Sequence, residues 1–388
     1  MFGKKSNIRK VAHKFRLYES KSKCRVVDSI LFTMGKMWNF GLAAIKEHYK
    51  QTGKYLSSKK VYALMKIERD SNPYWQLIGT QSMQEIVQRL DASYQRFFQK
   101  VQKRPPKFKS SKRFTSIVFK QTSYKVQNNI ITLLLGKGRA KKHKQFKFIN
   151  SRNRDYQRKS CKEANFYNLR IKRDSQDRYW AIFTIVEPKQ TYKTRKTRGA
   201  IGGDFGLKKY LTAFNGKDFP KVENPQFLKQ DLQLLQQKSK VFSRKKKGSN
   251  NRKKALKELL KVHRNITNKR NDWQWNLAHK LCQRFKFIGI EDLNIQAMQR
   301  IWGRKISDLA HSEFINKLKH VARKYGTVIQ EVDRFFASSK TCCNCGYRKA
   351  ILSLKERIFD CSNCGKRMDR DKNAAVNILK EAVKLYSQ

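Results

Sequence analysis

Apolar positions in the N-terminal third of the chain change from a two-residue period to a helical one. Residues 11–18, VAHKFRLY, alternate apolar and polar side chains, which predicts a half-buried strand. The residues that follow place apolar side chains on one face of a helix: Val27, Ile30, Leu31, Met34 and Trp38. Pro73 predicts a break, because proline is tolerated at a helix start, and a second amphipathic helix follows over residues 83–97.

Residues 107–188 differ from this helical block, because short alternating or β-rich runs are separated there by basic, polar loops. The runs begin at residues 114, 130, 146, 168 and 179. Such a pattern is typical of a small barrel or sandwich. Together with the strand over residues 11–18, these runs predict one β domain into which the helical block is inserted.

The C-terminal half mixes strands and helices. Residues 201–216, IGGDFGLKKYLTAFNG, predict two strands joined by a tight turn, and residues 224–285 predict a helical hairpin with its corner at Gly248. The apolar run FKFIGI, a helix, a strand over residues 327–332 and a last helix over residues 375–386 complete the series. This order of elements is the one that an RNase H-like α/β fold produces.

Three acidic positions stand at the ends of these elements. Asp204 ends the first strand, Glu291 ends the run FKFIGI, and Asp369 or Asp371 precedes the last helix. In such a fold the two strand ends and the start of the last helix converge. Taken singly, each acid could instead serve a turn, a basic neighbour or a helix cap. Asp371 lies four residues before Ala375 on the buried stripe, so it is the predicted third member, and Asp369 the predicted cap.

Converging carboxylates repel one another unless cations neutralise them, and an all-oxygen ligand set selects Mg²⁺ or Mn²⁺. Two such ions can activate a water molecule and stabilise the leaving 3′ oxygen of a phosphodiester. Asp204, Glu291 and Asp371 are therefore predicted both as catalytic residues and as magnesium ligands of a nuclease.

Four of the eight cysteines form two Cys-x-x-Cys pairs, Cys342/Cys345 and Cys361/Cys364. Two such pairs can close a tetrahedral shell of four thiolates around one Zn²⁺ ion, which leaves no position open for chemistry. The predicted zinc is therefore structural. Cys343 lies inside the first pair and could compete for the ion, although its spacing is the poorer one.

The charge balance points to a polyanionic partner. Lys and Arg number 89 against 29 Asp and Glu, which gives a formal charge of +60. In a compact fold these basic side chains would repel one another unless a polyanion were bound. Disorder is disfavoured by 24 Phe, 15 Tyr and 6 Trp. The corner of the helical hairpin concentrates basic residues that predict nucleic-acid contacts, with a solvated loop as the alternative: Arg244, Lys245, Lys246, Lys247, Arg252, Lys253 and Lys254.

Localisation is predicted from what the apolar runs lack. No run approaches the roughly 18 apolar residues of a membrane span. The first residues, MFGKKSNIRK, lack the apolar core of a signal peptide. The expectation from these observations is a cytosolic or nuclear protein without a membrane partner.

Several motifs taken together resemble one known family. They are IGGDFG, SRKKKGSNNRKKA, IGIEDLN, SSKTCCNCG and FDCSNCGKRMDRDKNAAVNIL. This combination strongly resembles the TnpB family, the RNA-guided nucleases encoded by bacterial insertion sequences, which is related to compact type V CRISPR effectors. The resemblance spans nearly the whole chain and is weakest over residues 107–179. The family's Asp-Glu-Asp triad falls on Asp204, Glu291 and Asp371, and Cys343 departs from the usual non-ligand residue.

The resemblance implies a multidomain α+β protein: a β-barrel wedge domain with an inserted helical recognition lobe, then an RNase H-like (RuvC) α/β nuclease domain with a zinc-ribbon insertion. The implied parts are first wedge strands 1–20, recognition lobe 21–104, wedge domain 105–188, linker 189–199, nuclease 200–336 with hairpin 224–285, zinc ribbon 337–368 and final nuclease helix 369–388.

The implied function is Mg²⁺-dependent, RNA-guided DNA cleavage, and the implied location is the bacterial cytosol, in association with the nucleoid. The partners would be an element-derived guide RNA and double-stranded target DNA read next to a short adjacent motif, with one protein monomer per guide RNA. Base pairing would then read the sequence, and the protein would supply a positive channel. The alternatives are a guide-directed DNA-binding regulator that does not cut, a compact type V CRISPR effector, and a conventional transposase that joins DNA ends.

Overall fold

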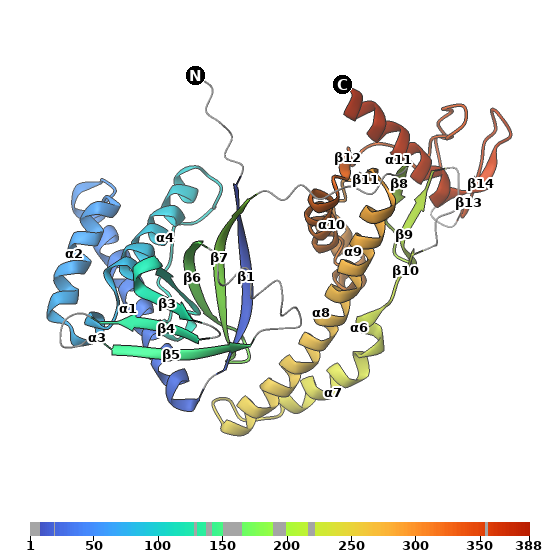
Figure 1. The fold of residues 1–388 in the computed structure, drawn as a ribbon. Helices are drawn as coiled ribbons and strands as arrows, with labels where there is room; N and C mark the ends of the chain where they lie inside the picture. The colour runs from blue at the N-terminus through green and yellow to red at the C-terminus, as the bar shows by residue number, and fades with distance from the viewer. Residues whose placement is uncertain are drawn as a thin grey trace, which may run out of the picture. The chain divides into compact units, whose positions relative to one another are not determined.

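The computed structural model describes residues 8–18, 20–127, 130–136, 142–149, 165–188, 199–215, 222–353 and 356–388. The chain divides into two compact units, Met1–Lys189 and Gln190–Gln388 (Figure 1). The predicted linker lies outside the described residues except for Gly199. In the part of the chain that the structure describes, no helix is both long and apolar enough to cross a membrane.

The first unit contains a seven-stranded antiparallel sheet. Its order is β2-β6-β7-β1-β5-β4-β3. The strands are β1 (Ile8–Tyr18), β2 (Ser116–Lys120), β3 (Tyr124–Gln127), β4 (Ile130–Leu135), β5 (Lys142–Ile149), β6 (Asn165–Arg173) and β7 (Tyr179–Pro188). Because β1 pairs with both β5 and β7, the helices between β1 and β2 are inserted into one β domain, as the residue pattern predicts. Closure into a barrel stays a prediction.

Helices α1 (Lys21–Thr52), α2 (Ser58–Ser71), α3 (Pro73–Gln76) and α4 (Thr80–Phe98) form the inserted block. The predicted break at Pro73 is confirmed: Pro73 begins α3, and the Asn72 side chain accepts hydrogen bonds from the backbone of Tyr74 and Trp75. The apolar faces pack in a common core, in which Trp38 is only 2% exposed. Two 3₁₀ turns, Ser111–Arg113 and Gln121–Ser123, flank β2.

The second unit is built on a five-stranded sheet of order β10-β9-β8-β11-β12. Its strands are β8 (Ala200–Asp204), β9 (Lys209–Phe214), β10 (Val222–Glu223), β11 (Phe287–Glu291) and β12 (Val328–Val332). The hairpin partners β8, β9 and β10 are antiparallel, whereas β8, β11 and β12 are parallel. Parallel neighbours bring the carboxyl ends of β8 and β11 to the same edge, which is where the site lies.

The helices of this unit are α6 (Phe227–Gln230), α7 (Leu232–Ser243), α8 (Asn250–Arg284), α9 (Ile295–Leu309), α10 (His311–Tyr325) and α11 (Arg370–Ser387). The predicted corner of the hairpin is confirmed, because Ser249 caps α8 by accepting a hydrogen bond from the Arg252 backbone. Sequence reasoning missed α9, which is kinked at Gly303 (φ 38°). Helix α11 packs against β8, β11 and β12 (Figure 1).

Two short antiparallel strands, β13 (Ile358–Asp360) and β14 (Arg367–Asp369), lie between β12 and α11 in the chain. Each Cys-x-x-Cys pair ends in a tight turn with a glycine at positive φ, Gly346 in the first and Gly365 in the second. Glycine adopts this conformation without steric cost. These turns aim the thiols of each pair toward those of the other.

Candidate active site and metal centre

Asp204 and Glu291 stand at adjacent strand ends. In the parallel pairing of β8 with β11, Gly203 is opposite Ile290, and the two acids are the next residues of their strands. Both side chains are half-buried. The shared strand-end position that the sequence predicts for them is therefore confirmed.

Two glycines show which face of the sheet these acids occupy. A Cβ atom on Gly202 would lie 1.8 Å from the carbonyl oxygen of Ala375, and one on Gly289 would lie 2.7 Å from Cβ of Ala382. Both glycines therefore face α11. Side chains alternate along a strand, so the residues two positions later, Asp204 and Glu291, point to the same face.

Asp371 lies in the first turn of α11, one helical turn before Ala375. The structure brings it near the other two acids, because α11 packs against β8 and β11, the strands that end in Asp204 and Glu291. The pKa of Asp204 agrees with this arrangement. Burial raises this pKa well above the ordinary range, and the charges of Glu291 and Asp371 raise it further. Burial also raises the pKa of Glu291, against a hydrogen bond from Ser338 that lowers it.

Asp369 is the N-cap of α11, as predicted. Its Oδ1 accepts hydrogen bonds from the backbone nitrogens of Asp371 at 2.9 Å and Lys372 at 3.1 Å. Burial raises the pKa of Asp369, but these bonds and the ammonium of Lys209 outweigh burial and hold the pKa below its ordinary value. The cap fixes the first turn of α11 and thereby the backbone of Asp371.

Cations and a hydroxyl surround the acids. Lys209 Nζ lies 3.1 Å from Asp369 Oδ2 and 3.7 Å from Asp371 Oδ2. Arg370 Nε lies 3.7 Å from Asp371 Oδ1, and Ser338 Oγ donates to Glu291 Oε1 at 3.2 Å. Sequence reasoning missed Lys209 and Ser338, because neither residue type nor spacing distinguishes them from other lysines and serines.

The donor set of the three acids fits a divalent cation. All their side-chain donor atoms are carboxylate oxygens, which Mg²⁺ and Mn²⁺ prefer. The pKa of Asp204 is raised first by burial and then by the charges of Glu291 and Asp371, and a bound cation would offset the cost of keeping the three carboxylates ionised.

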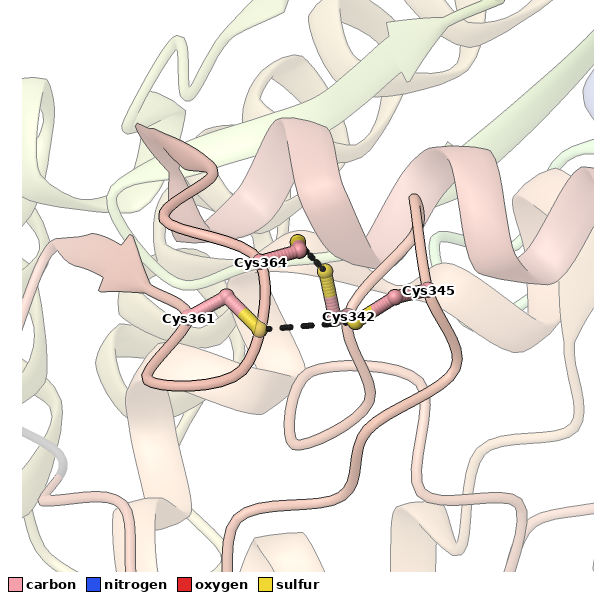
Figure 2. A group of neighbouring side chains, drawn as sticks. All are labelled: Cys342, Cys345, Cys361 and Cys364. Carbon is pink, nitrogen blue, oxygen red and sulfur yellow. Dashed lines mark hydrogen bonds between the residues drawn. The ribbon is translucent and has the colours of Figure 1, made fainter.

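The four predicted zinc ligands form one cluster. Figure 2 shows the thiols of Cys342, Cys345, Cys361 and Cys364 turned toward one another, all within 4.8 Å. Sγ of Cys342 lies 3.7 Å from Sγ of Cys364, and Sγ of Cys345 lies 3.6 Å from Sγ of Cys361. A tetrahedral ion with bonds of about 2.3 Å separates its sulfurs by roughly 3.8 Å, so the cluster fits Zn²⁺.

Cys343 lies outside this cluster. Its thiol instead contacts Sδ of Met368 at 3.4 Å, and its backbone nitrogen donates to Asn373 Oδ1. The arrangement of the thiols therefore favours Cys342 and Cys345 over Cys343 as ligands of the ion.

The basic corner of the helical hairpin divides into two kinds of side chain. Arg252 is half-buried, donates to the carbonyl oxygens of Phe242 and Lys245, and covers the Phe242 ring at 4.1 Å. It therefore holds the corner together. The other six predicted contacts are exposed: Arg244, Lys245, Lys246, Lys247, Lys253 and Lys254. An open hollow of about 660 Å³ beside them is lined by Lys245, Lys254 and Lys257 among others.

Comparison with known sequences finds two family models that together cover most of the second unit. The family described as "Probable transposase" matches residues 183–302, and the family described as "Cas12f1-like, TNB domain" matches residues 311–378. A protein of Streptomyces pristinaespiralis, named "Putative RNA-guided DNA endonuclease", is 30% identical over 305 residues, which are 78% of this chain and 71% of that protein. A "TnpB-like protein" of Acanthamoeba polyphaga mimivirus is 31% identical over 54% of this chain and 42% of its own length.

The chain belongs to the TnpB family. Among solved structures, the Cas12f1 chain of a Cas12f1–sgRNA–target DNA complex matches 96% of this TnpB chain and 99% of its own length, with a TM-score of 0.59 and 15% identity. At that identity the match concerns the fold, which is the mixed α and β architecture of a compact Cas12 protein.

Proposed function

We propose that this TnpB protein is the RNA-guided DNA endonuclease of an insertion sequence. It hydrolyses phosphodiester bonds of DNA that matches its guide, next to a short adjacent motif. Family membership and the name of the Streptomyces relative support the reaction class. The observation that carries the proposal is the convergence of Asp204, Glu291 and Asp371 at one end of the sheet.

In this proposal the second unit is a RuvC-type nuclease whose three acids hold Mg²⁺ or Mn²⁺. The bound cation would activate water and stabilise the leaving oxygen. The protein's own residues prepare the site. Asp204 and Glu291 are fixed by adjacent strands, and the capping bonds of Asp369 fix the helix that carries Asp371. Ser338 holds one oxygen of Glu291. Zn²⁺ in the cysteine cluster has a structural role.

The partners proposed are a guide RNA and double-stranded target DNA, with one monomer per RNA. The charge of +60 suits a protein that tracks phosphates while base pairing reads the sequence. The solved Cas12f1 relative in fold is itself a complex with guide RNA and target DNA. The six exposed cations of the hairpin corner are the proposed contact surface.

The remaining assignments follow the family. The first unit would comprise a wedge domain and a recognition lobe, with boundaries as predicted from the sequence, and residues 337–368 a zinc ribbon. A cytoplasmic location agrees with this function. A regulator that binds DNA without cutting is disfavoured, because such a protein has no use for three converging carboxylates.

The test begins by sequencing the RNA that copurifies with the protein and preparing DNA that matches it. Asp204→Asn should reduce Mg²⁺-dependent cleavage roughly a thousandfold, since metal-ion catalysis contributes several kcal/mol. RNA binding should remain. Retained cleavage by Asp204→Asn would refute the site, and absence of cleavage by the unaltered protein would favour the regulator.

Asp371 and Asp369 provide a matched pair of carboxylates within the same turn. Asp371→Asn should reduce cleavage as strongly as Asp204→Asn does. Asp369→Asn should retain most of it, because asparagine caps helices as well as aspartate does. The reverse ranking of the two variants in the cleavage assay would exchange their proposed roles.

A further inference from the structure

Three buried polar side chains join the cysteine cluster to the proposed nuclease site. Ser338 is 5% exposed, Asn373 is fully buried and Asn377 is 5% exposed. Ser338 begins the segment that leads into the first cysteine pair, and the two asparagines lie on one face of α11. Buried polar groups of this kind are retained where their hydrogen bonds define a structure.

The asparagines attach residues 338–343 to α11. Asn377 Nδ2 donates to the carbonyl oxygens of Ser338 at 2.8 Å and Thr341 at 2.6 Å. Asn373 Nδ2 donates to Thr341 O at 2.7 Å, and its Oδ1 accepts from the backbone nitrogen of Cys343 at 2.9 Å. The backbone on either side of Cys342 is thereby fixed to the helix that begins with Asp371.

The same segment reaches the second acid. The hydroxyl of Ser338 donates to Oε1 of Glu291 at 3.2 Å, while the Ser338 carbonyl accepts from Asn377. One residue therefore connects the end of β11 with the middle of α11. A carboxylate with one oxygen held in this way presents its other oxygen in a defined direction.

We propose that Ser338 is a positioning residue for Glu291, and that Asn373 and Asn377 make its position depend on the metal-loaded cysteine cluster. The inference rests on the proposed function of Glu291 as a metal ligand. Loss of zinc would release residues 338–343 from α11, and Glu291 would lose the hydrogen bond that orients it. The cysteine cluster thus acts on the proposed nuclease site through these hydrogen bonds.

The first experiment removes the hydroxyl alone. Mn²⁺ binding to the full chain with its RNA is measured from the electron paramagnetic resonance of free Mn²⁺, and binding that survives in Asp204→Asn is subtracted as background. Ser338→Ala should weaken the remaining Mn²⁺ binding about tenfold, the usual effect of losing a partner of a metal ligand. Ser338→Thr keeps a hydroxyl and should bind as the unaltered protein does.

Ser339 provides the matched control, because it is the neighbouring serine while the bond to Glu291 belongs to Ser338. Ser339→Ala should leave Mn²⁺ affinity and cleavage unchanged. Unchanged Mn²⁺ affinity in Ser338→Ala, with a loss in Asp204→Asn, would overturn this inference alone. Equal Mn²⁺ binding by Asp204→Asn and the unaltered protein would overturn the proposed nuclease site as well.

The second experiment tests the connection to zinc by a double-mutant cycle with Cys361→Ser, in which melting curves verify folding. If the cluster acts through Ser338, Cys361→Ser should weaken Mn²⁺ binding in the unaltered background and have little further effect in Ser338→Ala. Additive losses would overturn the connection. Asn377→Ala keeps all four cysteines and should reproduce the Mn²⁺ defect with full zinc content, so a folding failure of the cysteine variant still leaves a decisive result.

Discussion

Gly202 and Ala375 are in such close contact that no side chain fits between them. A Cβ atom at position 202 would lie 1.8 Å from the carbonyl oxygen of Ala375 and 2.9 Å from the backbone nitrogen of Leu379. The backbone of β8 therefore lies directly against the backbone of α11. This contact sets the distance between the strand that ends in Asp204 and the helix that begins with Asp371.

Gly202→Ala is predicted to separate α11 from the sheet. Overpacking usually costs about 1–3 kcal/mol, and a backbone oxygen cannot turn away as a side chain can, so the loss should reach or exceed that range. Hydrogen exchange of α11 amides should accelerate, and cleavage should fall with it. Gly79→Ala is the control, because a Cβ atom there meets nothing within 4 Å. Unchanged exchange in Gly202→Ala would contradict the packing described.

The sequence predicted the strand ends and the cap of this site because both are local or periodic features. The apolar run FKFIGI had to be buried, so the residue after it had to lie at a sheet edge, and Glu291 does. Asp371 followed from its four-residue spacing to Ala375, which the structure places against Gly202. The cysteine cluster followed from the geometry of one ion.

What the sequence did not reveal depends on contacts between distant residues. Lys209 and Asp369 are 160 positions apart, and Ser338 and Glu291 are 47 positions apart. Nothing in the local pattern of either pair indicates its partner. Helix α9 was missed for another reason: Gly303 interrupts it with a non-helical conformation, which breaks the apolar periodicity.

Lys209 is predicted to neutralise part of the negative charge of the site when no divalent cation is bound. Its ammonium neutralises Asp369 and Asp371, and its side chain is 24% exposed. Lys209→Met should therefore lower the free energy of unfolding by about 1 kcal/mol without Mg²⁺ and by less with saturating Mg²⁺. Denaturant titrations with and without added Mg²⁺ measure both values. Lys208→Met, at the exposed neighbouring position, should show no such difference.

The cysteine cluster predicts which thiols retain zinc. Cys361→Ser should lose bound zinc and unfold residues 338–369, since structural zinc contributes folding free energy directly. Cys343→Ser should retain one zinc per chain, because its thiol lies outside the cluster. Elemental analysis of the purified proteins distinguishes the two. Loss of zinc from Cys343→Ser alone would show that the ion uses a different set of ligands.

His311 is predicted to make the second unit sensitive to acid. The side chain is 1% exposed, and the centre of its ring lies 4.9 Å from that of Phe205 and 4.8 Å from that of Tyr210. Among the described residues, neither ring nitrogen has a hydrogen-bond partner. Burial lowers the pKa of His311 from 6.5 to about 4. Between these two pH values the imidazole is protonated in the unfolded chain and neutral in the folded protein. Stability should thus fall as the pH decreases from 6.5 toward 4, by about 2 kcal/mol between pH 7.5 and pH 5.

His311→Phe should remove this part of the pH dependence, whatever its effect on absolute stability. Denaturant titrations of both proteins at the two pH values provide the comparison. An identical pH dependence in the variant would show that other groups cause the acid sensitivity.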